Sequence, residues 1–378
     1  MGDTGKYKKI IRISRFKPNP TGDGAAKRSY QLVELLKANG FEVYDETLDL
    51  PKRLSLMSQV RLFLIGMLFA LRHLKYNPIC HLGGLVKESK YFGLRIAALK
   101  KYEDQRDKVL FLIEDTTQGA HGLPYILEDM KCRFVVVPHN IESLCVGVPV
   151  LSGERGNDWF KDDMERLRKA AETFCISKEE TWLTQLYGVK SHYLPYYPIG
   201  EIEKYLLAIR KKRENKEVQT DRKKQILLLG SASNAPTRNG MQNIIMHLAH
   251  YAELPFELHV AGYRTEWLKQ VEHPGIVYHG TLTQEQLESM MVSTDALLVY
   301  QEATSGALTR IIEYLVAGIP VVASFCAARD YYRMSGVYVY EQMDDLMALL
   351  QSVDVAEVPK PQRMKINEEL FINRLKQI

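Results

Sequence analysis

Residues 300–324 read YQEATSGALTRIIEYLVAGIPVVAS. This stretch places a strand end, a turn of small residues, a helix and a second apolar strand in close succession. The pattern predicts a helix that starts near Gly306 and Ala307. The first N–H groups of a helix are unpaired and point toward the preceding loop, where an anion can bind. Gly306 has no side chain and allows a ligand to approach closely. The layout is typical of a phosphate-binding site.

Arg310 and Glu313 are three residues apart on this predicted helix and therefore share a face. A guanidinium can neutralise diphosphate oxygens, and a carboxylate can accept hydrogen bonds from two ribose hydroxyls. The pair therefore fits a nucleoside diphosphate. The alternative is a surface ion pair without a function, which would stabilise the helix by about 0.2–0.5 kcal/mol.

Strands and helices alternate on both sides of this segment. In the C-terminal half we expect strands at residues 226–229, 257–261, 276–278, 296–300 and, as the last, 321–324. In the N-terminal half we expect strands at residues 10–13, 41–44, 109–113 and 134–137, and a helix over residues 24–39. Short apolar runs suit strands buried on both faces, and intervening helices imply parallel, doubly wound sheets. The predicted class is α/β, with ligands at the carboxyl ends of the strands.

The length of 378 residues exceeds what one hydrophobic core usually supports, so we expect two domains. Residues 203–224 are rich in lysine and arginine, and we interpret them as an interdomain helix and linker. The expected domains are residues 1–200 and 201–361. A terminal helix at about residues 362–378 is expected to pack back on the first domain.

The composition, with 46% apolar and 25% charged residues, is that of a soluble globular protein. A net charge of only +4 does not indicate nucleic acid as a partner. The five cysteines form no CxxC pair, so neither a zinc site nor a disulfide framework is predicted. Because the charged N-terminus also lacks a signal peptide, we expect a cytoplasmic protein.

The C-terminal half resembles the group 1 (family 4) retaining glycosyltransferases. Residues 317–324, AGIPVVAS, are similar to the AxGxPVVAS segment of that family. Residues 229–231, LGS, and 238–240, RNG, resemble its FxG loop and its KN or KG element. Residues 259–262, HVAG, resemble its LxIxG strand end. The resemblance implies the GT-B fold, in which the parallel sheets of two Rossmann-like domains face an interdomain cleft.

The resemblance also implies a glycosyltransferase whose co-substrate is a nucleoside-diphosphate sugar, with no further cofactor. The acceptor would be a glycan or a lipid-linked glycan, bound by the N-terminal domain. The donor-binding residues implied are Gly22, Gly24, Gly230, Ser231, Arg238, Asn239, Gly262, Ser305, Gly306, Ala307, Arg310 and Glu313.

One departure from the family concerns its pair of glutamates, which are separated by seven residues. That spacing would put the first glutamate at Ser305, and only the second, Glu313, is present. Glu302 lies three residues too early. Either Glu302 or a backbone group would then replace the missing carboxylate.

Beside Glu313, three residues of the N-terminal half are candidates for the reaction itself. His139 follows the 134–137 strand, where the family keeps its cleft histidine, and His121 is a weaker candidate. If the resemblance holds, His139 and backbone groups hold the sugar and the anomeric configuration is retained. An inverting reaction with Asp23 as the base stays open. The C-terminal half has no DxD pair at a strand end, so we expect no divalent metal.

Three different functions compete with the transferase interpretation. The loop of residues 18–24, PNPTGDG, follows a strand as a dinucleotide fingerprint would, but Lys27 occupies the place of the third glycine. A dehydrogenase is therefore disfavoured. A sugar-nucleotide epimerase of the same fold would process the donor without an acceptor. An inactive partner subunit would keep the fold and lose the chemistry.

An apolar helix is predicted around residues 57–74. It is too short to span a membrane, because Arg61 and Arg72 bound a run below the roughly 20 residues needed. The basic residues that flank it are Lys52, Arg53, Arg61, Arg72, His73, Lys75, Lys87 and Lys90. Such a helix can lie in an anionic lipid surface, at the inner face of the membrane. The alternative is a helix buried within its own domain.

Overall fold

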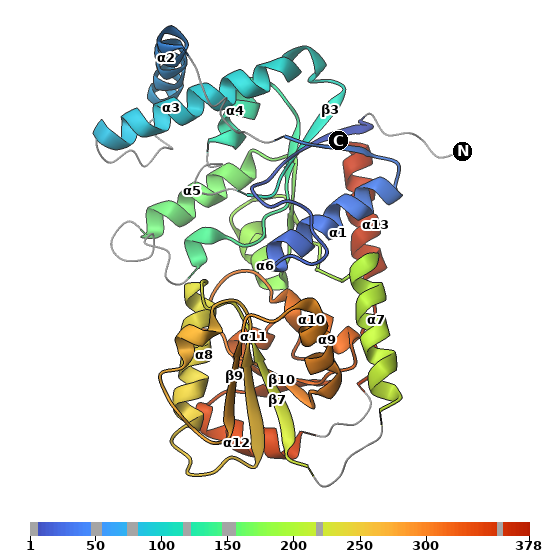
Figure 1. Ribbon diagram of the computed structural model, residues 1–378. Coiled ribbons are helices and arrows are strands. Elements are labelled where there is room, and N and C mark those ends of the chain that lie inside the picture. The colour runs from blue at the N-terminus through green and yellow to red at the C-terminus, as the bar shows by residue number, and fades with distance from the viewer. Residues whose placement is uncertain are drawn as a thin grey trace. The chain divides into compact units, whose positions relative to one another are not determined.

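The computed structural model describes residues 7–46, 55–73, 82–115, 122–145, 156–216, 222–353 and 358–378. The chain divides into two compact units. Unit 1 comprises Met1–Pro195 and Met364–Ile378, and unit 2 comprises Tyr196–Arg363. Each unit contains one six-stranded sheet flanked by helices (Figure 1). This confirms the predicted α/β class with two doubly wound sheets.

The strands of unit 1 are β1 (Lys9–Ile13), β2 (Glu42–Asp45), β3 (Val109–Ile113), β4 (Phe134–Val136), β5 (Glu172–Cys175) and β6 (Ser191–Tyr193). They lie in the order β2-β1-β3-β4-β5-β6, and all neighbours are parallel. The chain order reverses between β1 and β3. In open parallel sheets, ligands bind outside the carboxyl ends at such a switch point.

The helices of unit 1 are α1 (Gly24–Ala38), α2 (Leu56–Arg72), α3 (Leu82–Leu99), α4 (Leu123–Asp129), α5 (Gly156–Arg168), α6 (Lys178–Leu186) and α13 (Lys365–Gln377). Gly40, with φ +82°, follows α1 and supplies the left-handed conformation that ends a helix. Although α13 closes the sequence, Phe371 packs in the same core as Ile10 and Leu32, with its ring 4.7 Å from that of Phe174.

Helices α2 and α3 form a hairpin at the margin of unit 1 (Figure 1). Their backbones touch at two glycines. A Cβ on Gly66 would lie 1.7 Å from the carbonyl oxygen of Ser89, and one on Gly93 would lie 1.8 Å from that of Leu62. Phe69, Ala70 and Phe92 continue this contact into the core of unit 1. One face of α2 is thus buried, as a helix packed within its own domain would be.

The strands of unit 2 are β7 (Lys224–Leu229), β8 (Phe256–Ala261), β9 (Ile276–Gly280), β10 (Ala296–Val299), β11 (Val321–Ser324) and β12 (Val337–Tyr340). The helices are α7 (Glu201–Glu214), α8 (Ala235–Leu248), α9 (Gln284–Ser293), α10 (Thr309–Val316), α11 (Phe325–Ala328) and α12 (Met343–Ser352). The parallel order β12-β11-β10-β7-β8-β9 has its switch point between β7 and β10. Helix α8 covers one face of this sheet and α9 and α10 the other (Figure 1).

Two expectations for unit 2 were wrong. The strands do not end at β11, because β12 pairs with it from Val321↔Val337 to Ser324↔Tyr340. Three of the four residues of β12 are only half-buried, as suits an edge strand, whereas β10 and β11 are buried throughout. Helix α10 begins at Thr309, so Gly306 and Ala307 belong to the preceding turn.

The basic segment after residue 200 is mostly a helix of unit 2. In α7, Arg210 donates hydrogen bonds to the carbonyls of Leu315 and Val316, both at 2.7–2.8 Å, at the C-terminal end of α10. Arg213 donates to the carbonyls of Met291 and Thr294, at 2.8 and 2.5 Å, around the end of α9. Two of its cations therefore donate hydrogen bonds to carbonyls at the C-terminal ends of two other helices.

Replacing Arg213 by methionine should lower the free energy of unfolding by about 2–4 kcal/mol, because it leaves part-buried carbonyls without a donor. Urea unfolding followed by circular dichroism would measure the change. Lys211→Met is the matched control, since Lys211 is exposed on the same helix. Equal stability of the two variants would contradict the structural role of Arg213.

Candidate functional site

The backbone is tightly packed where β7 and β8 end. Gly262 has φ +123°, and a Cβ there would lie 1.9 Å from the carbonyl oxygen of Gly230. The amide of Gly230 donates to the carbonyl of Ala261 at 3.1 Å, and that of Ala232 to the carbonyl of Tyr263 at 2.9 Å. Only glycine fits at position 262. The two predicted donor-site glycines therefore lie together at the carboxyl edge of the sheet, beside the switch point.

Arg310 reaches this same place from α10. Its Nη1 atom donates a hydrogen bond to the carbonyl of Leu229 at 2.6 Å, and it would lie 3.3 Å from a Cβ on Gly230. Burial lowers the pKa of Arg310. The structure therefore brings Arg310 and Gly230 together, and it holds a guanidinium in partly dry surroundings where its charge acts strongly on a nearby anion.

Glu313 is buried, with 5% of its surface exposed. Its Oε1 atom accepts a hydrogen bond from the hydroxyl of Tyr196 at 2.7 Å. The expected alternative, a solvent-exposed ion pair between Arg310 and Glu313, does not fit these positions. Tyr196 could not be found from the sequence as a partner, because 117 residues separate it from Glu313.

The turn before α10 contains Ser305, Gly306 and Ala307. Gly306 is buried and has φ +82°, a conformation that glycine adopts readily. Arg329 donates hydrogen bonds to the carbonyl of Gly306 and, at 2.7 Å, to that of Cys326. Sequence analysis missed Arg329, which brings a second guanidinium to the predicted anion-binding turn. Arg329 directly follows α11, the short helix after β11, and no sequence pattern marked it as a partner of Gly306.

Three further predicted donor residues lie on the loop and helix after β7. The hydroxyl of Ser231 contacts that of Ser233 at 2.7 Å. Asn234 caps α8 by accepting from the amide of Thr237 at 3.2 Å. Arg238, in the first turns of α8, is half-buried, and Asn239 is exposed.

A second polar cluster occupies the switch point of unit 1. Arg12, in β1, binds Glu114, directly after β3, through Nε–Oε1 at 2.5 Å and Nη2–Oε2 at 3.0 Å. The Nη1 atom of Arg12 lies 2.6 Å from Asp45 Oδ1 at the end of β2. The hydroxyl of Ser29, on α1, donates to Glu114 Oε2. Sequence analysis missed this cluster, although an arginine inside the apolar strand KIIRI indicates a buried charge that needs a partner.

His139 belongs to this cluster. Its Nε2 atom lies 3.4 Å from Glu114 Oε2, and its ring meets that of Phe16 edge to face at 4.9 Å. Burial alone would raise the pKa of Glu114, but His139 and Arg12 lower it to about 2. Glu114 is therefore a carboxylate at neutral pH and can orient the imidazole. His121 lies outside the described residues.

The predicted glycine loop before α1 has a structural role. Asp23 is the N-cap of α1, and its Oδ1 atom accepts from the amide of Ala26 at 2.9 Å. A Cβ on Gly22 would lie 2.6 Å from the Cβ of Ala26, so the turn requires glycine. Gly24 is the first residue of the helix. Asp23 is exposed, and its carboxylate already stabilises the helix end.

Glu114→Gln should weaken the acid sensitivity of the fold. The folded pKa of Glu114, about 2, lies below its ordinary value of 4.5. Its ionised form therefore stabilises the protein above about pH 4.5, and this contribution is lost as the pH falls toward about 2. Between these values, the free energy of unfolding should fall more in the wild type than in Glu114→Gln.

Urea unfolding at about pH 6 and about pH 3.5 would measure the difference. The exposed Glu103→Gln serves as the control and should behave like the wild type. A Glu114→Gln variant with an unchanged pH dependence would contradict the low pKa.

The chain is similar to known proteins in structure, but no significant similarity in sequence is found. No family model matches the chain, and no curated protein matches its sequence significantly. Among solved structures, sucrose-phosphate synthase from Thermosynechococcus elongatus is 15% identical, with a TM-score of 0.60 over 98% of this chain and 95% of that one.

Two more solved structures match over nearly the full length. α,α-Trehalose 6-phosphate synthase from Burkholderia multivorans is 12% identical, with a TM-score of 0.61 over 99% of this chain and 94% of that one. HepE from Anabaena, solved in complex with UDP and glucose, is 13% identical, with a TM-score of 0.55 over 98% and 96%. The two doubly wound units of this chain therefore have the fold of the GT-B glycosyltransferases.

Proposed function

We propose that the chain is a glycosyltransferase that moves a sugar from a nucleoside-diphosphate sugar to a glycan or lipid-linked glycan acceptor. The observation that carries this proposal is the half-buried guanidinium of Arg310 beside the Gly230 backbone, at the switch point of the unit 2 sheet. Structures with the same fold support it, since one of them holds UDP and glucose. The pathway we propose is polysaccharide or glycoconjugate biosynthesis.

In this proposal, unit 2 binds the donor. The diphosphate would lie beside Arg310 and the turn around Gly306, at the carboxyl edge of the sheet. Arg310 and Arg329 would neutralise its charge, with Arg238 on α8 as a further cation. The remaining predicted donor residues, Ser231, Asn239, Gly262, Ser305 and Ala307, lie on the loops and helix around these groups.

Glu313 would accept hydrogen bonds from the ribose hydroxyls, as the sequence predicted. The hydroxyl of Tyr196, 2.7 Å away, would hold its carboxylate in position. Tyr196 is thus proposed as a positioning residue.

The chemistry we propose depends on charge stabilisation. As the bond from the anomeric carbon to the diphosphate breaks, the leaving group gains charge and the sugar gains oxocarbenium character. Arg310 and Arg329 would stabilise the leaving group without a divalent metal. His139, oriented by Glu114, would bind the sugar, and the anomeric configuration would be retained.

An inverting reaction would require Asp23 as a base. Its carboxylate accepts the amide of Ala26 and caps α1, so the structure provides it with a helix-capping role. We therefore favour retention. Determining the anomeric configuration of the product by NMR distinguishes the two reactions.

An epimerase, an inactive subunit and a transferase differ in how they use the donor sugar and the acceptor. An epimerase would convert the donor sugar with no acceptor present, whereas a transferase releases nucleoside diphosphate only as fast as a water or acceptor hydroxyl takes the sugar. An inactive subunit would do neither. The cations and the buried carboxylate of unit 2 favour an intact donor site.

A nucleoside diphosphate should raise the melting temperature of the protein, because ligand binding stabilises the folded state by about 2.7 kcal/mol at a hundredfold excess over Kd. A screen of UDP, GDP, ADP and CMP with their sugar conjugates would name the base. Arg310→Met and Glu313→Gln should abolish the shift, and the exposed Lys211→Met should keep it. Chelation of divalent metals should leave both binding and transfer unchanged.

If no nucleotide shifts the melting temperature of the wild type, the donor site is contradicted and the inactive-subunit interpretation is supported. Circular dichroism of Arg310→Met and Glu313→Gln shows whether a lost shift reflects lost binding or lost folding. Tyr196→Phe, a milder change, should weaken binding without abolishing it.

We also propose that the protein lies on the cytoplasmic face of a membrane, where a lipid-linked acceptor would be presented. The outer face of α2 carries five large apolar side chains that are 46–82% exposed: Met57, Val60, Leu64, Leu68 and Leu71. We call these residues the α2 stripe. Their spacing of three or four places them on one face of the helix, and an exposed patch of this kind marks an interaction site.

The residues around the α2 stripe favour a lipid surface. Arg61 and Arg72 are exposed on α2, which contains no acidic residue. An apolar face with basic neighbours binds anionic bilayers. Among the described helices, none is both long and apolar enough to cross a membrane. The predicted flanking residues Lys52, Arg53 and Lys75, and Leu74 at the end of the predicted helix, lie outside the described residues.

Co-sedimentation with anionic vesicles at low salt tests this proposal. Leu64→Gln with Leu68→Gln should abolish the binding that the wild type shows, because it removes apolar contact area without changing charge. The matched control, Leu186→Gln with Met246→Gln, changes two exposed apolar residues elsewhere and should bind normally. The proposal is contradicted if the wild-type protein does not bind the vesicles. It is also contradicted if the wild type forms a dimer that the α2 substitutions dissociate and the control substitutions do not.

A further inference from the structure

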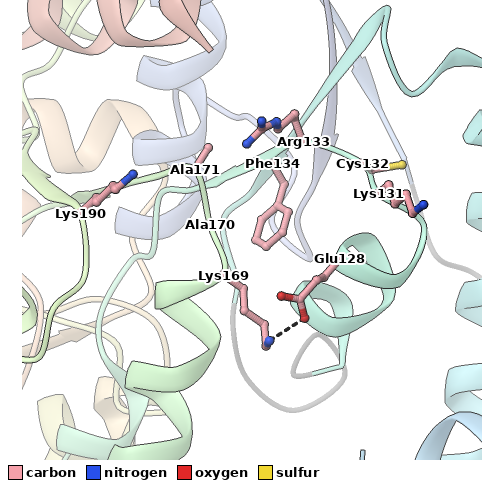
Figure 2. A pocket seen from close by; sticks show the side chains of 9 residues that line it. All are labelled: Glu128, Lys131, Cys132, Arg133, Phe134, Lys169, Ala170, Ala171 and Lys190. Carbon is pink, nitrogen blue, oxygen red and sulfur yellow. Dashed lines mark hydrogen bonds and ion pairs between the residues drawn. The ribbon is translucent and has the colours of Figure 1, made fainter. Parts of the chain in front are cut away.

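A basic pocket opens in unit 1, at the edge of its sheet opposite the cluster of Arg12, Glu114 and His139. Its volume is about 400 Å³, within the range of small-molecule sites. It is lined by Glu128, Lys131, Cys132, Arg133, Phe134, Lys169, Ala170, Ala171 and Lys190 (Figure 2). Arg133, Ala171 and Lys190 directly precede β4, β5 and β6. The pocket is therefore at the amino ends of these strands, away from the switch point.

The lining carries an excess of positive charge. It contains four cations and one carboxylate, Glu128. Glu128 is already compensated, because its Oε2 atom lies 2.5 Å from Lys169 Nζ, as Figure 2 shows. Three cations remain, Lys131, Arg133 and Lys190, and all three are exposed. They are available to an anion without breaking the Glu128–Lys169 pair.

A second cavity of about 390 Å³ continues the first, since both are lined by Arg133, Ala171 and Lys190. It adds Arg374 and Glu172. Glu172 is compensated by His192, whose Nε2 atom is 2.7 Å away, and by Arg374 at 3.9 Å. The added carboxylate therefore does not cancel the positive charge of the shared lining.

Cations also occur near helix C-termini because they stabilise the helix dipole. Lys131 and Lys169 follow the ends of α4 and α5 and fit that explanation. It does not account for Arg133 and Lys190, which precede strands and line the same cavity. Phe134 and Ala170 are buried at its base, so an anion there would be partly shielded from water.

We propose that this pocket binds a phosphate-bearing ligand as a second anion site, distinct from the donor site. Arg133 offers the planar fork that matches two phosphate oxygens, and Lys131 and Lys190 act as point charges. The pocket adjoins the α2–α3 hairpin, because Asp129, next to Glu128, contacts His73 at 3.0 Å and Arg72 at 3.5 Å. The phosphate can thus come from a soluble compound or from a lipid headgroup.

Isothermal titration with inorganic pyrophosphate tests the site. Arg133→Gln with Lys190→Gln should weaken binding at one site about tenfold or more, because it removes charge-assisted hydrogen bonds to the phosphate oxygens. The matched control is Lys8→Gln with Lys108→Gln, which removes two exposed charges at the same edge of the sheet, outside both cavities. The control should bind pyrophosphate like the wild type.

Two further experiments complete the test. The first distinguishes this site from the donor site, and the second distinguishes a soluble ligand from a lipid headgroup. Arg310→Met should lose nucleotide binding and keep pyrophosphate binding at the pocket. The Arg133/Lys190 double variant should keep nucleotide binding and lose pyrophosphate binding at the pocket. Vesicles containing phosphatidic acid should bind the wild type better than phosphatidylserine vesicles of equal charge if the ligand is a headgroup, and equally if it is soluble. Unchanged pyrophosphate binding in the Arg133/Lys190 double variant overturns the proposal.

Discussion

All neighbouring strands in both sheets are parallel, and this one constraint decides where the chemistry of the protein is placed. Parallel strands end at a common edge, and where the chain order reverses the flanking loops diverge and leave space for a ligand. In unit 2 this edge brings together Gly230, Gly262 and Arg310. In unit 1 it brings together Arg12, Glu114 and His139. The same geometry sends the opposite ends of the strands, and the basic pocket with them, to the far edge.

Charge burial at these edges is costly unless partners compensate it. Glu114 is fully surrounded by Arg12, Ser29 and His139, so its carboxylate keeps its charge inside the sheet. Removing one partner of such a group is strongly destabilising, because the other charge is then left buried. Within the described part of the chain, Arg310 donates one hydrogen bond that compensates its charge in part, to the carbonyl of Leu229, and an added anion would complete the arrangement.

The α2–α3 hairpin has one face that is tightly packed and another that exposes apolar side chains. Gly66 and Gly93 allow the backbones to touch, which fixes the hairpin tightly. The α2 stripe points the other way and exposes leucines that a protein acting alone in water would bury. The two expectations for this segment, a lipid-facing helix and a helix buried by its domain, were therefore not exclusive. The face that packs on α3 is buried, as the second expectation requires. The face that carries the α2 stripe is the basis of the membrane proposal.

The sequence determined the features that depend on neighbours along the chain. The apolar runs of β3 and β11 lie where they were predicted, at residues 109–113 and 321–324, because continuous apolar runs require burial on both faces. Gly306 was identified from a strand-to-turn pattern, whereas Gly230 and Gly262 were identified from the resemblance of their segments to those of the family. Helix α10 starts later than predicted, since the small residues taken for its first turn form a separate turn.

Tertiary structure decided what depends on residues far apart in sequence. Glu114 meets Arg12 across 102 residues, Glu313 meets Tyr196 across 117, and Arg329 reaches Gly306 across 23. Nothing in local spacing marks these pairs. The basic residues of α7 likewise resemble a solvated linker in sequence, whereas in the fold they meet carbonyl partners at the ends of α9 and α10. Periodicity reports which face of an element is buried, but a side-chain partner is chosen by how the elements pack, and that is settled only in three dimensions.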